Sequence, residues 1–214
     1  MIIIGAGGHG QVVAEALLAA RASQQRDMDL LGYADDDPGL WGQTLIGLRV
    51  LGSVTAALEQ PHDAVIVAVG ANHVRHEISA RLTASGESLV SAIHPAAVVS
   101  PHAQIGPGCM VLAGAVVNAG ARLGTSVIVN TCASVDHHSV LGDGVHIAPG
   151  AHTGGEVIIG RGALVGIGAS VSPRCTIGAW AVIGAGATVI HDIPAGCTAI
   201  GTPARIIKQI EVTP

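Results

Sequence analysis

The feature that most constrains the fold is an internal repeat of six residues that runs unbroken from residue 93 to residue 189. Stepping six residues at a time from Ile93 reaches 17 positions, of which 16 are aliphatic and one is Thr153. A parallel series that starts at Ser91 and ends at Ala187 carries only small residues. Repeats at a fixed period are the signature of solenoid architectures, in which each unit stacks on the next.

The period of six excludes an α-helix, because 3.6 residues per turn cannot keep a six-residue repeat on one face. A triangular prism with three short strands per turn accounts for the repeat. One large aliphatic per face points inward, and small residues and glycines stand near the corners. Successive coils of three repeats then stack at about 4.8 Å through parallel ladder hydrogen bonds. The unbroken repeat predicts about five coils without a protruding loop.

Composition agrees with such a lattice and argues against several classes of function. The 214 residues include no Phe, one Tyr and two Trp, so the core must be built from aliphatic and small side chains. A formal charge of −5 without a basic run argues against nucleic acid as a partner. The N-terminus has no basic leader and no apolar run reaches about 18 residues. We therefore expect a cytoplasmic protein without membrane insertion.

The first part of the chain follows a different pattern. Apolar strands alternate with helices, as in a small Rossmann-like α/β domain, with strands expected at 1–4, 30–34 and 64–69 and helices at 11–21 and 72–85. We therefore divide the chain into an α/β domain at residues 1–90 and a β-helix domain at residues 91–214.

A glycine-rich turn, GAGGHG at residues 5–10, follows the first expected strand. It fits the G-x-G-x-x-G pattern that places a pyrophosphate on a helix N-terminus, and Asp35 and Asp36 lie at the end of the next strand. An NAD-dependent enzyme is one interpretation. The domain is too short for a second mononucleotide-binding half, however, and the same physics would serve a nucleotide-sugar.

The repeat resembles that of the hexapeptide-repeat acyltransferases. The resemblance implies a left-handed parallel β-helix, a homotrimer, and acyl-CoA bound in clefts between neighbouring subunits. The segment Gly201-Thr202-Pro203-Ala204-Arg205 is similar to the one that closes the β-helix in that superfamily. We expect a short C-terminal helix at 204–210 to follow it.

The combination of GAGGHG, a Tyr-Ala-Asp-Asp segment at 33–36, a Val-Gly-Ala-Asn segment at 69–72 and the hexapeptide repeats resembles the NeuD-type sugar acetyltransferases over essentially the whole chain. That family includes N-acetyltransferases of nucleotide-linked 4-amino-4,6-dideoxy sugars. The resemblance implies that the nucleotide-sugar contacts Gly7, Gly8, His9, Asp35, Asp36 and Gly70.

Acyl transfer from a thioester to an amine needs a base near the amine and a donor for the oxyanion, and a histidine suits the first task near pH 7. One coil after His137 comes Gly155, which has no side chain to crowd a thioester and whose amide could face the oxyanion. The family's catalytic histidine lies in a segment that matches Asp136-His137-His138, so we predict His137 as the base.

The family has a second acid where this chain has His138, so Asp136 or Glu156 takes over that role or the base is tuned differently. The resemblance also places a set of residues along or near the acetyl-CoA: Asn130, His146, Gly155, Ile167, Gly184 and Ala185.

Three functions compete on this evidence. The first is acetyl-CoA-dependent N-acetylation of a nucleotide-linked amino sugar, with O-acetylation of a sialic acid or another polysaccharide unit as its variant. The second is a binding protein that senses a nucleotide or a sugar, and the third is an NAD-dependent enzyme. No spacing of histidines or cysteines indicates a metal site, so we expect a metal-independent acetyltransferase.

Overall fold

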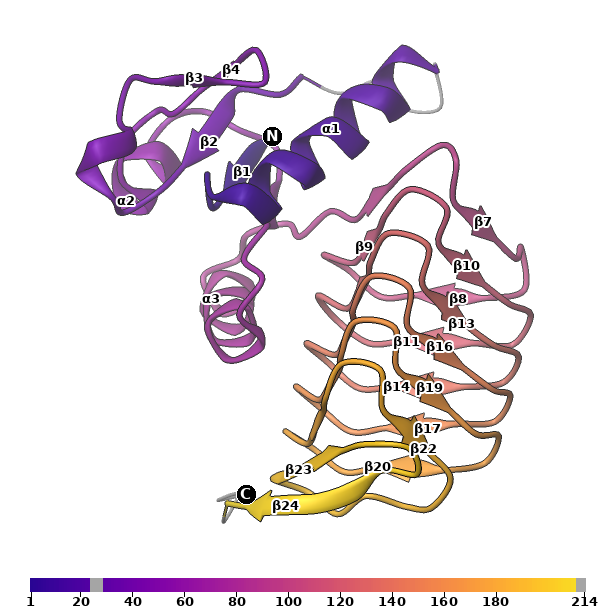
Figure 1. Cartoon of the computed structure of the whole chain (residues 1–214). Helices are drawn as coiled ribbons and strands as arrows, with labels where there is room; N and C mark the ends of the chain where they lie inside the picture. Colours follow the sequence, from indigo (N-terminus) through magenta and orange to yellow (C-terminus); the bar gives the residue numbers. More distant parts are fainter. Residues whose placement is uncertain (24–28, 211–214) are drawn as a thin grey trace.

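The computed structural model describes residues 1–23 and 29–210 and has two parts, a small α/β layer and a tall triangular prism (Figure 1). The prism begins at residue 92 and consists of two-residue strands that recur every six residues. Each strand pairs in parallel with the strand one coil away, so Val116 lies opposite Ser134 and Val117 opposite Val135. The predicted β-helix is therefore confirmed.

The prism has three faces, which we number in the order in which the chain visits them. The first face holds β6 (Ala92–Ile93), β9 (Met110–Val111), β12 (Ile128–Val129), β15 (His146–Ile147), β18 (Leu164–Val165) and β21 (Val182–Ile183). The second face holds β7 (Val98–Val99), β10 (Val116–Val117), β13 (Ser134–Val135), β16 (His152–Thr153), β19 (Ser170–Val171) and β22 (Thr188–Val189). The third face holds β8 (Gln104–Ile105), β11 (Arg122–Leu123), β14 (Val140–Leu141), β17 (Ile158–Ile159) and β20 (Thr176–Ile177).

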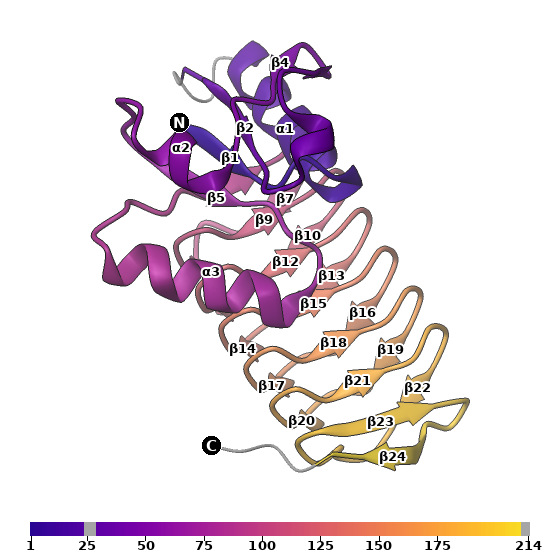
Figure 2. The same cartoon turned by 90° about the vertical axis from the view of Figure 1, so that its left-hand side faces the viewer.

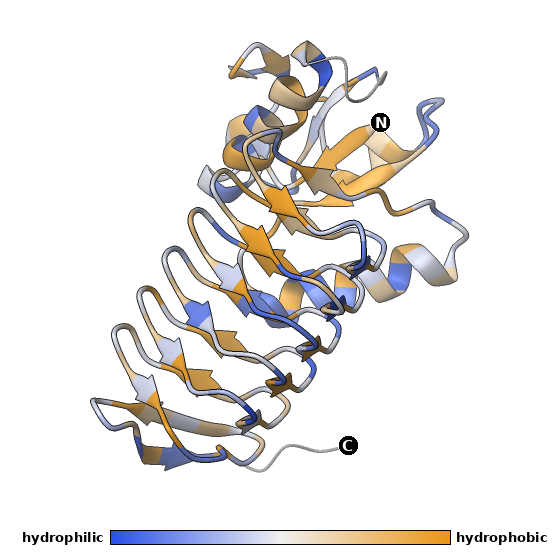
Figure 3. Cartoon of the chain, turned by 90° about the vertical axis from the view of Figure 1, so that its right-hand side faces the viewer, coloured by the Kyte–Doolittle hydropathy of each residue, from blue (hydrophilic) through white to orange (hydrophobic). Residues whose placement is uncertain are grey.

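Both series of the repeat point into the prism. From Val111 to Val189 every position of the aliphatic series is buried, and so is every position of the small series from Cys109 to Ala187. Each small residue comes two positions before an aliphatic one, so both side chains point to the same side of the strand, into the prism. The small side chains leave room in the narrow interior for the large ones. Ile93 differs, with 36% of its surface exposed, because it lies in the first coil. The strands are mostly apolar and the turns more hydrophilic (Figure 3).

The N-terminal layer is a parallel sheet of β1 (Ile2–Ile4), β2 (Gly32–Ala34) and β5 (Val65–Val67) in the order β2-β1-β5. Its helices are α1 (Gly8–Ala22), α2 (Val54–Leu58) and α3 (Asn72–Ala84), and smaller elements are the 3-10 turn η1 (Pro38–Leu40) and the hairpin of β3 (Thr44–Leu45) and β4 (Leu48–Arg49). The predicted strands and longer helices are present, whereas the hairpin and α2 were not predicted.

The two parts share a hydrophobic cluster across the division that we predicted at residues 90 and 91. Ile3 and Leu17 of the α/β layer pack in one buried cluster with Met110 and Ile128, whose side chains point outward from the first face. None of the helices in the described ranges is long and apolar enough to cross a membrane.

The predicted C-terminal helix is wrong. Residues Arg205–Gln209 form strand β24, which pairs antiparallel with β23 (Cys197–Ile200), and β23 pairs in parallel with β21. The β-branched pair Ile206 and Ile207 favours a strand over a helix. The last coil also presents unpaired backbone groups at its edge, which a hairpin satisfies and a helix does not.

Helix α3 lies against one corner of the prism, between the third and first faces, and crosses the coils obliquely (Figure 2). We call this corner the docking corner (residues 124–127, 142–145, 160–163 and 178–181). Contacts follow successive coils: Ser79 Oγ lies 2.8 Å from Ser126 Oγ, Arg75 donates to Gly144 O, and Asn72 donates to Gly162 O. A helical turn rises about 5.4 Å and a coil about 4.8 Å, so one turn of α3 meets one coil.

The next coil adds Trp180, whose ring lies 5.4 Å from the ring of His73. A Cβ at Gly162, which has φ +68°, would overlap the Trp180 ring, whereas a Cβ at Gly168, with φ +65°, would meet no atom within 4 Å. Gly162→Ala and Gly168→Ala therefore share a backbone strain of about 1–2 kcal/mol. We expect Gly162→Ala to lose a further ~1–3 kcal/mol of unfolding free energy through overpacking. Equal losses in denaturant unfolding would contradict the Trp180 contact.

Candidate functional site

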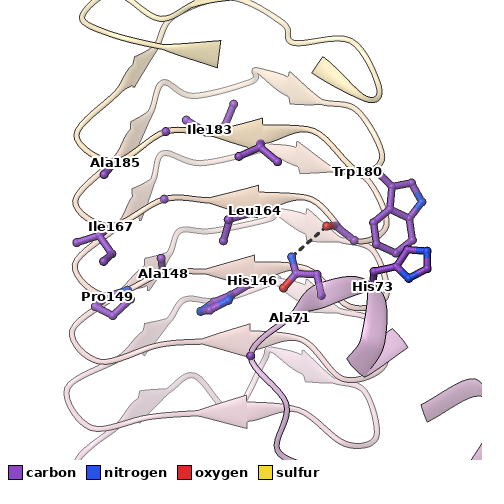
Figure 4. A pocket seen from close by; sticks show the side chains of 16 residues that line it. Ala71, His73, His146, Ala148, Pro149, Leu164, Ile167, Trp180, Ile183 and Ala185 are labelled. Atoms are coloured by element: carbon purple, nitrogen blue, oxygen red, sulfur yellow. Dashed lines mark hydrogen bonds between the residues drawn. The ribbon is translucent and has the colours of Figure 1, made fainter. Parts of the chain in front are cut away.

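A cavity of about 720 Å³ opens between the first face of the prism and the start of α3 (Figure 4). Leu164 and Val182 form an apolar floor, and Gly70 to His73 form the wall on the side of the α/β layer. Five residues that we predicted to bind ligands line this cavity together: Gly70, His146, Ile167, Gly184 and Ala185.

Asn130 and His146 are joined at the edge of this cavity. The backbone N–H of Thr131 donates to Asn130 Oδ1 at 2.8 Å, which leaves the amide nitrogen Nδ2 facing His146 Nε2 at 3.0 Å. An amide nitrogen only donates, so Nε2 of His146 is the acceptor. Burial, then the charges of Arg75 and His9, lower the pKa of His146 to about 3, so its ring is neutral at physiological pH.

The glycine-rich turn leads to the same place. Gly7 precedes α1 and Gly8 is its first residue, and a Cβ at either would meet nothing within 4 Å, so the space before the helix is open. The ring of His9 lies 6.3 Å from that of His146 between centroids. Burial and the nearby Arg75 lower the pKa of His9 to about 4.

The two predicted substrate carboxylates contact the backbone. Asp35 accepts from the N–H of Ala6 at 2.7 Å and from the N–H of Asp37 at 3.0 Å, which ties the glycine-rich turn to the end of β2. Asp36 accepts from the N–H of Val54 at 2.9 Å, at the start of α2. Both therefore shape the loop around the turn, whatever else they contact.

The predicted catalytic residues lie at another corner, between the second and third faces, which we call the histidine corner (residues 136–139 and 154–157). Here the structure brings His137 and Gly155 together, since a Cβ at Gly155 would overlap the His137 ring. The side chains of His137 and His138 are exposed, and their Nδ1 atoms lie 3.2 Å apart. Glu156 is turned away toward Arg174, with Oε2 and Nε 3.6 Å apart.

Asp136 orders the backbone of this corner. Its Oδ1 accepts from the N–H of His137 at 2.7 Å and from Asn118 Nδ2 at 2.7 Å. These two hydrogen bonds hold the pKa of the Asp136 carboxyl below its usual value. The carboxylate thus holds the backbone N–H of His137 in place. The ring of His137 contacts His138 instead.

Thr153 is a residue of this site that the sequence analysis did not assign. Its hydroxyl accepts from the N–H of Asp136 at 3.1 Å. Along the same face the N–H of Asn118 instead donates to the backbone carbonyl of Val135. The single break in the aliphatic series therefore replaces a ladder bond directly before His137, and the break itself is the signal that could have found it.

The predicted residues thus form two groups on different sides of the prism. Asn130 and His146 stand on or beside the first face, with the cavity and the glycine-rich turn. His137 and Gly155 stand at the corner opposite that face. No group of three His, Cys, Asp or Glu side chains in residues 1–23 and 29–210 is arranged to hold a metal ion.

Comparison with known proteins separates the two parts in the same way. Residues 1–82 match the PglD N-terminal domain family, and residues 156–191 match the bacterial transferase hexapeptide family of six repeats. UDP-N-acetylbacillosamine N-acetyltransferase of Bacillus subtilis is 40% identical over 117 residues, which are 52% of this chain and 50% of that protein. The match therefore spans half the length of that relative.

Solved structures match over nearly the whole chain. The acetyltransferase domain of PglB from Neisseria gonorrhoeae is 40% identical, with a TM-score of 0.88 over 96% of this chain and 98% of that one. GDP-perosamine N-acetyltransferase from Caulobacter crescentus, solved with CoA and GDP-perosamine, is 38% identical, with a TM-score of 0.90 over 97% and 96%. WeeI from Acinetobacter baumannii is 30% identical, with a TM-score of 0.84 over 96% and 98%.

The hexapeptide β-helix, the cavity against its first face and these matches define an acetyltransferase of the left-handed β-helix class. Within that class, the chain belongs to the NeuD-type sugar acetyltransferases, whose α/β layer and prism it shares from end to end. The sequence-based assignment to this family is thereby confirmed.

The role of the Thr153 hydroxyl can be tested by substitution. In Thr153→Val the N–H of Asp136 either loses its partner, at about 1–3 kcal/mol, or returns to a regular ladder bond. Both outcomes displace His137, so we expect kcat to fall about tenfold or more. Thr153→Ser keeps the hydroxyl and is the matched control. Equal kcat in the Val and Ser variants would show that the hydroxyl does not position His137.

Proposed function

We propose that this chain transfers the acetyl group of acetyl-CoA to the amine of a nucleotide-linked 4-amino-4,6-dideoxy sugar, with His137 as the general base. The observation that carries this proposal is the pairing of an exposed histidine with a bare glycine one coil away, His137 with Gly155. Two of the related proteins named above are UDP-N-acetylbacillosamine N-acetyltransferase and GDP-perosamine N-acetyltransferase. Acetyl-CoA is a cytoplasmic metabolite, so we place the reaction in the cytoplasm.

The proposed substrates fit the two open spaces beside the first face. The nucleotide diphosphate would lie at the start of α1, where Gly7 and Gly8 leave the backbone N–H groups accessible and the helix dipole favours an anion. The sugar would then extend toward His9 and His146. The pantetheine arm of acetyl-CoA suits the apolar floor of the cavity at Leu164 and Val182.

The chemistry needs one proton transfer at the histidine corner. The neutral amine attacks the thioester carbonyl carbon, the new C–N bond forms, and His137 takes the proton that the amine loses. Nδ1 of His137 faces His138, so Nε2 is the atom left to act. The N–H of Gly155 makes no hydrogen bond within residues 1–23 and 29–210 and is available to the oxyanion. The C–S bond then breaks, and the CoA thiolate leaves and takes up a proton.

The separation of the two groups of residues supports a homotrimer. The histidine corner of one chain and the first face of the same chain point away from each other, so only a neighbouring copy can bring them together. Val98 on the second face and Val140 and Ile158 on the third face point outward with 64%, 43% and 53% of their surface exposed. Such apolar faces suit an interface between copies. We therefore place each active site between two subunits.

The base is tested with His137→Ala. We expect release of free CoA thiol with nucleotide-linked amino sugars to fall by about 10²–10⁴-fold in kcat, the usual contribution of a general base. His152→Ala is the matched control, because His152 is also exposed, one coil away on the second face, and its ring hydrogen-bonds only to Ser134, at 2.9 Å, among the described residues. Unchanged kcat in His137→Ala would refute the assignment. Thiol release with a sialic acid but with none of the nucleotide-sugars would refute the acceptor.

The shared site is tested by mixing subunits. His137→Ala and His146→Ala each disable every site of their own homotrimer. In randomly mixed trimers about one quarter of the sites combine an intact His137 with an intact His146 from the neighbour. We therefore expect thiol release to recover to about one quarter of the wild-type rate after co-refolding. Light scattering should show three copies per particle. No recovery from mixed trimers would place the whole site within one chain.

A further inference from the structure

Arg75, in the second turn of α3, is a buried cation that pairs with no carboxylate in residues 1–23 and 29–210. Its side chain is fully buried, and every hydrogen bond that it donates ends on an uncharged oxygen: Ser126 O at 2.9 Å, Val69 O at 2.9 Å, Gly70 O at 3.1 Å, Asn72 Oδ1 at 3.0 Å and Gly144 O at 2.7 Å. Burial lowers the pKa of Arg75 to about 10, so the guanidinium stays charged. Burying a charge without a counter-ion costs free energy of folding. We therefore expect Arg75 to have a function that offsets this cost.

The oxygens that Arg75 holds belong to the segments that carry the cavity residues. Gly70 begins the segment that walls the cavity, and Gly144 lies two residues before His146 on the adjoining coil. Ser126 lies at the same corner one coil earlier, just before the strand that leads to Asn130. One guanidinium therefore joins the α/β layer to both coils that bear Asn130 and His146.

Gly70 is where this network comes closest to His146. Its carbonyl accepts from Arg75 at 3.1 Å. A hydrogen bond to the Gly70 backbone acts to raise the pKa of His146, against the larger effects of burial, Arg75 and His9. Since Nε2 of His146 accepts from Asn130, the proton of the neutral ring is on Nδ1, which is the ring atom left to donate to Gly70. The second N–H of the Asn130 amide has no partner in the described part of the chain.

We propose that Arg75 is a positioning residue of the acetyl-transfer centre: by holding the Gly70 carbonyl against the coil of Gly144, it fixes the tautomer and the orientation of His146. His146 in turn accepts from one N–H of the Asn130 amide, whose oxygen the N–H of Thr131 holds, and this leaves the second N–H of the amide available to a ligand. This inference rests on the proposed function for the reaction concerned, but the state of the His146 ring is independent of any assay.

Electrostatics work in the same direction. The charged and titratable groups that act on the His146 ring are Arg75 on α3 and His9 on α1, and both lower the pKa of His146 in addition to burial. Removing the positive charge at Arg75 favours the protonated ring, so the pKa of His146 rises. A protonated Nε2 could no longer accept from Asn130. The variant would therefore lose activity toward acidic pH over a range where the wild type keeps it.

Lysine cannot replace this arginine. The guanidinium offers five N–H donors in a fixed planar fork. Arg75 donates to five oxygens, two on the prism and three on the α/β layer. An ammonium has three donors and no planar fork. Arg75→Lys thus keeps the buried charge and removes the geometry, whereas Arg75→Met removes both.

The experiment combines nitrogen NMR of the His146 ring with rates of thiol release in the full-length trimer. In the wild type we expect a neutral ring with the proton on Nδ1 that does not titrate above about pH 5. In Arg75→Lys we expect a mixture of tautomers and a fall in kcat of about 10²-fold. In Arg75→Met an acid limb should also appear in the pH–rate profile.

Ser79→Ala is the matched control, because Ser79 is buried on the same helix and bonds the same corner through Ser126, away from Gly70 and Gly144. It should lower stability and leave the His146 tautomer and the pH profile unchanged. A wild-type ring protonated on Nε2, or one that titrates near its ordinary pKa, would overturn the proposal without any variant. Inactive wild-type protein with the expected ring state would refute the proposed reaction and leave the positioning role intact.

Discussion

The parallel ladder between coils is the constraint on which the rest of the structure depends. It sets each residue beside the one 18 positions later, as Arg122 lies opposite Val140. Corners as well as strands inherit this spacing, so columns of side chains run the length of the prism. One column meets α3 at Ser126, Gly144 and Gly162, and another sets His137 beside Gly155. Because neighbours in this fold are always 18 residues apart, a site can be built from residues that are distant in the sequence.

The ladder also explains how a second domain is held in register. A helix whose turn is close to the coil rise can contact one coil per turn, and α3 does so through Asn72, Arg75 and Ser79. The cost is the burial of the Arg75 cation, which has no carboxylate partner among the described residues. The gain is that the glycine-rich turn and the coil of His146 are fixed relative to each other, with His9 and His146 at 6.3 Å. The two proposed binding regions can hold their ligands in a productive geometry only if they are rigid relative to each other.

The sequence predicted what the repeat controls and missed what depends on distant partners. The coils, the burial of both series and the closeness of His137 to Gly155 followed from counting residues. The C-terminal strand was missed because its partner is the edge of the last coils, which no local pattern of residues 204–210 records. Arg75 was missed because α3 has mixed polarity, and a buried arginine there has the sequence pattern of a surface one. The sequence did not show that the predicted site residues form two groups on opposite sides of the prism, because this depends on how the faces are arranged in space.

Deviations from the repeat mark the residues of the proposed site. Thr153 breaks the aliphatic series and draws the N–H of Asp136 out of the ladder, directly before the proposed base. His146 stands on the first face in an outward column that is otherwise apolar from Ala92 to Val182, and it is the member of that column that Asn130 contacts. A regular prism needs neither residue for stability, since a valine or a leucine would satisfy the lattice at both. Polar residues that depart from a strict repeat, at positions where the repeat would suffice, are therefore the strongest local indication of function in such a fold.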